Sequence, residues 1–234
     1  MLDLQKWSLI GLSLLVGLSG PVFADDNIDW AGSDLGIGLG AGFGSANVTG
    51  NRFTYDSNAA VNRVDHTFSG AGGEIYAGRN FTAGRIVYGG EVGLSWADLN
   101  SAMVFNADDD IDEASVGLTG TLSGRLGYSF DNLLLYLKAG VALAQTRNIG
   151  GDVDGGVLDA ADAHDRNGLQ VGPLVGIGGE HQLPKGIRLR IEYTYTDFFS
   201  YREANDQGAV PGSQSYVVDN GPIQRVTVGL IMPF

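Results

Sequence analysis

The stretch that decides the fold lies at the end of the chain: Val226-Thr227-Val228-Gly229-Leu230-Ile231-Met232-Pro233-Phe234. Every second residue from Val226 to Phe234 is apolar. Successive side chains of a strand point to opposite faces, so these apolar residues share one face. A chain terminus in water frays unless something ties it down, whereas a strand whose apolar face meets lipid can carry an aromatic residue at its end. The run therefore predicts a strand in the wall of a membrane barrel.

A second run explains the composition of the chain. Apolar residues and glycine alternate through Leu35-Gly36-Ile37-Gly38-Leu39-Gly40-Ala41-Gly42-Phe43-Gly44, and glycine makes up 37 of the 234 residues. That is about twice the average usage. The inner wall of a narrow barrel needs small residues, because long side chains from facing strands must find room there, while apolar residues face lipid. The run predicts a first strand with glycine inward.

Similar alternation recurs along the chain and predicts strands at about 66–79, 86–97, 114–129, 133–147, 168–182, 187–199 and 222–234. Short connections lie at 80–85, 130–132 and 183–186. Long polar segments lie at 49–65, 98–113, 148–167 and 200–221. This alternation of short and long connections is typical of bacterial barrels. The sequence therefore predicts an all-β protein, an eight-stranded antiparallel transmembrane β-barrel with short periplasmic turns and long extracellular loops.

Residues 1–24 are predicted to be a signal peptide, cleaved after Ala24, and residues 25–234 to be the barrel domain. Lys6 gives a positive start, the apolar segment 8–18 is too short to span a bilayer, and Val22-Phe23-Ala24 supplies small residues for cleavage. The chain has no cysteine, which fits an exported protein without disulfides. The net charge of −13 argues against nucleic acid as a partner.

Several motifs carry a resemblance to a known family. They are Trp30-Ala31-Gly32, Ala77-Gly78-Arg79-Asn80, Tyr88-Gly89-Gly90-Glu91, Gly124-Arg125-Leu126-Gly127-Tyr128, Leu189-Arg190-Ile191-Glu192-Tyr193 and the terminal Phe234. Their order and spacing resemble the porin-like, opacity-type small outer-membrane β-barrel family of alpha-proteobacteria. The resemblance implies a place in the outer membrane of a Gram-negative bacterium, with lipid and lipopolysaccharide around the barrel. It also implies that Phe234 is an assembly signal for the outer-membrane assembly machinery.

The predicted inner face carries a nearly balanced set of charges: Glu74, Glu91, Arg125, Lys138, Glu180, Arg188, Arg190, Glu192 and Arg225. A charge facing lipid near mid-membrane costs about 2–4 kcal/mol, whereas the interior of an eight-stranded barrel has room for side chains. We therefore expect a lumen charge network that plugs the barrel, with Glu91 and Arg125 as direct partners on neighbouring strands. The alternative is a charged constriction in a narrow porin-like channel for small solutes.

The long polar segments are acidic. Asp108, Asp110, Asp152 and Asp154 are candidate ligands for Ca²⁺ or Mg²⁺, since clustered carboxylates are hard oxygen donors. The pattern at 151–156 lacks the rest of a calcium loop, so we favour solvated, mutually repelling loops. The open alternatives are an extracellular ligand and divalent ions that bridge these acids to lipopolysaccharide phosphates.

The sequence contains few residue patterns that are typical of a catalytic site. His66 lies near Asp65 and Ser69, and His164 precedes Asp165, which leaves a rim-located lipid hydrolase as a remote alternative. No G-x-S-x-G, P-loop or H-E-x-x-H motif occurs in the chain. The sequence predicts no enzyme and no cofactor, and favours a structural role in envelope integrity and surface contact.

Overall fold

The computed structural model describes residues 29–50, 63–105, 110–154, 157–158, 164–198, 201–204 and 215–234. The strands are β1 (Gly32–Gly50), β2 (Arg63–Ala83), β3 (Ile86–Ala97), β4 (Leu99–Phe105), β5 (Asp110–Phe130), β6 (Leu133–Asp154), β7 (Val157–Leu158), β8 (His164–Gln182), β9 (Arg188–Thr196), β10 (Tyr201–Ala204) and β11 (Ser215–Pro233). A 3-10 helix covers Pro184–Gly186. No helix in this part of the chain is long and apolar enough to cross a membrane. The expected signal peptide, 1–24, lies outside the described residues.

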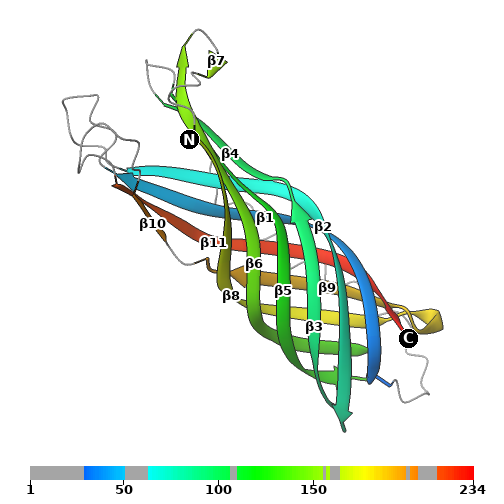
Figure 1. Ribbon diagram of the computed structural model, residues 1–234. Helices are drawn as coiled ribbons and strands as arrows, with labels where there is room; N and C mark the ends of the chain where they lie inside the picture. The colour runs from blue at the N-terminus through cyan, green and yellow to red at the C-terminus, as the bar shows by residue number, and fades with distance from the viewer. Residues whose placement is uncertain are drawn as a thin grey trace, which may run out of the picture.

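Eight of the described strands close into an antiparallel barrel, as predicted. Neighbours pair in the order β1, β2, β3, β5, β6, β8, β9, β11, and β11 pairs back with β1. The closing register places Ile37 opposite Leu230. Because the ring is closed, the barrel wall has no free edge whose backbone groups would face lipid unpaired. β1 begins and β11 ends at the same end of the barrel (Figure 1).

The connections at that end are short, as expected. Gly84 and Arg85 form one turn, and Asp131 and Asn132 form another. Gly84 and Asp131 have φ angles of 62° and 52°, a left-handed backbone that glycine adopts readily and aspartate tolerates. In bacterial outer-membrane barrels the tight turns face the periplasm. This end is therefore the periplasmic end.

The long connections at the other end are less loop-like than the polar composition suggested. β4 and the start of β5 fall within the expected loop 98–113, β8 begins inside 148–167, and β10 and the start of β11 fall within 200–221. A strand needs only about 9–11 residues to cross the membrane. The strands continue past that length because antiparallel pairing satisfies the backbone of polar segments as well as apolar ones. In Figure 1 these extensions project beyond the barrel.

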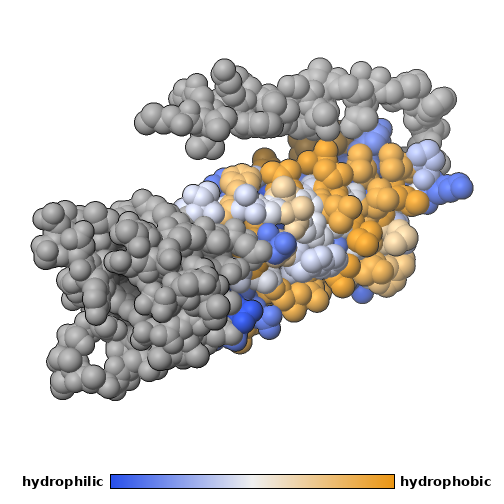
Figure 2. All heavy atoms as spheres, turned by 90° about the horizontal axis from the view of Figure 1, so that it is seen from above, coloured by the Kyte–Doolittle hydropathy of each residue, from blue (hydrophilic) through white to orange (hydrophobic). Residues whose placement is uncertain are grey.

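Exposed large apolar side chains line the outer wall, and Figure 2 shows them on one face of the barrel. Leu39 is 71% exposed, and the other predicted outward residues of β1 are exposed with it. Val116 is the exception: strict alternation along the predicted strand 114–129 places it on the lipid face with Leu118 and Leu122, but it is only 9% exposed, inside the barrel. The register of β5 against β6 shifts between Val116 and Thr119, and Gly117 and Leu118 are both exposed. This bulge places two consecutive residues of β5 on the outer side. As a result, the side chains on the extracellular side of the bulge point to the opposite face from the one that strict alternation indicates.

The glycine row of β1 leaves room for side chains that cross the lumen. The Tyr76 ring on β2 lies over Gly36, where a Cβ atom would overlap it. Glu74 lies over Gly38 in the same way, with its Oε1 3.0 Å from the position of a Cβ. Glycine on this face therefore makes space for side chains of other strands, as predicted.

Replacing Gly36 with alanine is expected to lower the free energy of unfolding by about 1–3 kcal/mol, because the methyl group forces the Tyr76 ring to move. Gly120→Ala is the matched control, since the nearest atom to its added Cβ is 4.0 Å away. Urea unfolding in detergent micelles measures both. Equal stabilities of the two variants would contradict this role of Gly36.

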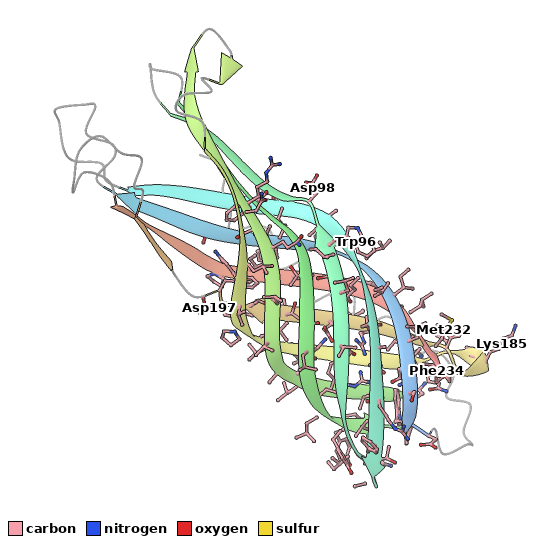
Figure 3. All side chains as sticks on the ribbon, in the orientation of Figure 1. Trp96, Asp98, Lys185, Asp197, Met232 and Phe234 are labelled. Atoms are coloured by element: carbon pink, nitrogen blue, oxygen red, sulfur yellow. The ribbon has the colours of Figure 1, made fainter. Side chains whose placement is uncertain are left out.

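Apolar layers lie in the lumen toward both ends. Toward the periplasmic end, Trp30, Val87, Leu134 and Tyr136 pack together. Toward the extracellular end the buried cluster contains Phe68, Leu99, Val116, Ala142, Ala144, Leu174, Phe198 and Ile223. Figure 3 marks the two ends, with Lys185 and Phe234 at the periplasmic one and Asp98 and Asp197 toward the other. Buried charged side chains lie in the lumen between the two layers.

Candidate functional site: a lumen ion network

Among the described side chains, eight that are buried and charged meet in the lumen and define what we call the lumen ion network. They are Asp34, Glu91, Arg125, Lys138, Glu180, Arg188, Arg190 and Glu192. Strand geometry positions them, since β9 alone supplies Arg188, Arg190 and Glu192 at every second residue. Four acids face four bases, so the set is neutral as a whole.

Glu180 on β8 is the centre of one half of the network. It is 0% exposed and is in contact with three arginines. Arg125 Nη1 donates to its Oε1 at 2.5 Å, Arg190 Nη2 donates to the same oxygen at 2.9 Å, and Arg188 Nη1 donates to its Oε2 at 3.1 Å. A buried carboxylate is tolerated only when charges and hydrogen bonds compensate its lost hydration, and these three guanidinium groups do so.

Lys138 on β6 is the centre of the other half. Its Nζ donates to Glu91 Oε1 at 2.6 Å and to Glu192 Oε1 at 2.8 Å. Arg190 joins the two halves, because its Nη1 lies 2.8 Å from Glu91 Oε2 while its Nη2 contacts Glu180. The network is therefore continuous across the lumen.

The direct partnership expected between Glu91 and Arg125 is weak in the structure. The closest distance, from Arg125 Nη1 to Glu91 Oε2, is 3.9 Å. The register explains it: Arg125 pairs with Gly89, two residues nearer the periplasmic end than Glu91. Arg125 on β5 instead contacts Glu180 on β8, two strands further along the wall, at 2.5 Å.

Sequence reasoning missed Asp34 and Asn80. Asp34 accepts hydrogen bonds from Arg188 and from Arg125 Nη2, the latter at 3.2 Å. Asn80 donates to Asp34 Oδ2 at 2.7 Å and accepts from Arg125 Nε at 2.8 Å. The sequence does indicate that Asp34 faces inward, because it lies two residues before Gly36 and so continues the inward row of Gly36 and Gly38.

Aromatic rings line the network. The Arg190 guanidinium carbon lies 4.0 Å from the centroid of the Tyr76 ring, and that of Arg188 lies 5.4 Å from the Trp30 ring. Such contacts stabilise a cation through the negative face of the ring. The Tyr136 hydroxyl donates to Glu192 Oε2 at 2.6 Å. These aromatic rings therefore lie among the ions of the network.

Glu74 and Arg225 lie apart from the network, nearer the extracellular layer. Arg225 Nη1 donates to Ser95 Oγ at 2.5 Å, and the Glu74 side chain is hydrogen bonded to that of Thr227. Arg225 also borders a cavity of about 20 Å³, lined in addition by Thr119, Thr121, Leu174, Thr194, Thr196, Phe198 and Ile223. Such a volume holds about one water molecule.

The candidate metal ligands are placed only by their backbones. Asp108 lies outside the described residues. Asp110 on β5 pairs directly with Asp152 on β6, and Asp154 follows two residues later, in parts of both strands whose side chains are not described. Among the described side chains, no group of three or more histidines and acids is arranged to hold a metal ion. Metal binding by these aspartates stays a prediction.

A closed antiparallel ring with an apolar outer wall and a charged interior defines an integral outer-membrane β-barrel of a Gram-negative bacterium. The chain belongs to the family described as "Outer membrane protein beta-barrel domain", which matches residues 10–220.

Individual relatives agree with this assignment. The 22 kDa outer membrane protein of Rhizobium leguminosarum bv. viciae is 34% identical over 146 residues, which cover 62% of this chain and 60% of that protein. The 25 kDa outer-membrane immunogenic protein of Brucella ovis is 31% identical over 188 residues, 80% of this chain and 78% of that protein. The crystal structure of the outer membrane protein OprG from Pseudomonas aeruginosa aligns with a TM-score of 0.56 at 13% identity. That alignment covers 90% of this chain and all of OprG, and it shows a shared fold.

Proposed function

We propose that this outer-membrane barrel is a non-conducting envelope protein, with a structural role in the membrane and a surface-contact role outside it. The observation that carries the proposal is the fully buried Glu180, held by arginines of β5 and β9 in the middle of the lumen. An ion that crosses the barrel has to break these contacts. The proposal includes no catalytic activity.

The size of the barrel and its apolar layers support the plugged state. Eight strands enclose an interior just wide enough for side chains. The layers around Trp30 and around Phe68 lie on either side of the lumen ion network, and an apolar layer gives a hydrated ion nothing to replace its water.

Planar-bilayer recording of the refolded protein tests the proposal. We expect no steady conductance step over a wide voltage range, from protein whose folded state is checked by heat-dependent gel migration. A porin reconstituted in parallel is the positive control. A stable conductance that disappears when Arg190 or Lys138 is changed would refute the plug and support the narrow channel instead.

Surface contact rests on the acidic segments at the extracellular end. The Brucella ovis relative is named an immunogenic protein, and by analogy we propose that the extracellular segments of this chain are accessible on the cell. Their carboxylates suit an extracellular ligand, or lipopolysaccharide phosphates bridged by divalent ions. Labelling of intact cells at a cysteine introduced in the segment 205–214 tests accessibility, with a cysteine at Lys185 as the periplasmic control.

Assembly is expected to depend on Phe234. This residue is 83% exposed at the end of β11, and its backbone N–H donates to Ser33 O at 2.9 Å, beside the seam between β1 and β11. Deleting Phe234 should reduce insertion into the outer membrane of cells more than folding in detergent, because the exposed phenyl ring is accessible to the outer-membrane assembly machinery. Quantitative blotting of membrane fractions measures the first and gel migration the second. Equal insertion of truncated and intact chains would contradict the role.

A further inference from the structure

The lipid-facing wall has a groove that the proposed function does not explain. Gly90, Gly124 and Ala139 lie side by side on β3, β5 and β6, since Gly90 pairs with Gly124 and Gly124 with Ala139. All three are exposed on the outer face. Because their side chains are small or missing, they form a trough across the strands.

Larger side chains border this trough. A groove of about 750 Å³ includes Gly124 and Ala139 of the trough, and Phe81, Tyr88, Leu126, Leu137 and Val175 line it as well. On the extracellular side Val92, Leu122 and Val141 stand next to the trough on the same three strands and are exposed too. The groove therefore has apolar walls on both sides and opens toward the membrane.

A cation stands at one end of the trough. Arg79 on β2 pairs with Gly90, so it continues the row of Gly90, Gly124 and Ala139. It is exposed on the outer face, and its guanidinium carbon lies 5.7 Å from the centroid of the Phe81 ring. Phe81 in turn stacks on Tyr88, with 5.6 Å between the ring centroids. No described carboxylate forms an ion pair with Arg79.

An arginine on the lipid face is unfavourable unless it reaches water or an anionic group. Arg79 lies near the end of β2, a few residues before the turn at Gly84 and Arg85, so it belongs to the periplasmic half of the barrel. Phospholipids make up that leaflet of an outer membrane. A phosphate diester is an anion that a guanidinium binds with two parallel hydrogen bonds.

We propose that Arg79 and the adjoining groove form a binding site for an anionic phospholipid of the periplasmic leaflet. The phosphate contacts the Arg79 guanidinium, and one acyl chain lies along Gly90, Gly124 and Ala139. Neighbouring strands are about 4.7–4.9 Å apart, so the row from Arg79 to Ala139 is roughly 15 Å long. An acyl chain spans one leaflet, about half of a hydrocarbon core that is roughly 30 Å thick.

A phospholipid fits these features better than a second copy of the chain. A second barrel packed on the groove would cover Arg79 with the apolar wall of its partner and remove the cation from any anion. The site concerns the outer wall and is independent of whether the lumen conducts.

Native mass spectrometry of the folded protein in detergent tests the site, with phosphatidylglycerol as the anionic probe and phosphatidylcholine as the zwitterionic one. We expect one phosphatidylglycerol to be retained with a preference of about fivefold, which corresponds to roughly 1 kcal/mol for one basic group near a phosphate. Arg79→Gln should abolish the preference. Ala139→Phe should fill the groove and reduce retention of both lipids.

Matched variants separate the site from general effects. Arg85→Gln removes an exposed arginine at the periplasmic turn, whose partner is Asp131. Ala41→Phe enlarges an exposed outward residue on β1, away from the groove. Neither should change retention. Equal retention of the two lipids by the unmodified protein, an unchanged preference in Arg79→Gln, or a dimer that excludes lipid would overturn the proposal. With lipopolysaccharide as a third probe, its retention in preference to phosphatidylglycerol would overturn the assignment to the periplasmic leaflet.

Discussion

Replacing Glu180 with glutamine is expected to lower the free energy of unfolding by about 3–5 kcal/mol, the usual result of removing one partner from a buried ionic cluster. The glutamine keeps the size of the side chain, so packing hardly changes. Three arginines, Arg125, Arg188 and Arg190, would lose their shared carboxylate while they remain buried. Urea unfolding in detergent micelles, followed by tryptophan fluorescence, measures the change.

A double-mutant cycle identifies the source of that loss. Arg125→Gln in the Glu180→Gln background should destabilise less than Arg125→Gln alone, with a coupling of about 0.5–3 kcal/mol. Asp131→Asn is the control, because its partner Arg85 is exposed and the Asp131 side chain is 82% exposed. Such a surface pair contributes at most about 1 kcal/mol. Equal losses from Glu180→Gln and Asp131→Asn would refute a stabilising network.

The second large effect is expected on the outer wall. Leu39→Arg should destabilise the folded barrel in lipid by about 2–4 kcal/mol, because Leu39 stands in the middle of the outward row from Leu35 to Phe43 and its charge would face hydrocarbon near mid-membrane. Folding into lipid vesicles at increasing urea concentrations measures it.

Ser45→Arg is the matched control for Leu39→Arg. Ser45 lies on β1 with the same outward facing, one step beyond the apolar row, and is exposed. The same charge near the interface should cost only about 0–1 kcal/mol. If the two variants were equally stable, the outward row of β1 would not lie in the hydrocarbon core.

The wall of this barrel was predictable from the sequence because facing along a strand is a local property. Leu39 and Val228 face outward and Gly40 and Thr227 face inward, as their alternation indicated. Alternation along the strand gives the wrong face for Val116. A bulge changes the phase of alternation without changing the letters, so only the pairing of β5 with β6 reveals that this residue points into the lumen.

The contacts inside the lumen and the groove outside it were decided by tertiary structure. Alternation predicted that Glu91, Arg125 and Glu180 face inward, but their partners depend on the stagger between strands, which closure of the whole ring sets. Arg125 therefore meets Glu180 and Asp34 rather than Glu91. The row of Arg79, Gly90, Gly124 and Ala139 likewise exists only once four strands are in register. The two-residue alternation of side chains can be recognised from neighbouring residues in the sequence. The register between strands, in contrast, is a property of the closed sheet.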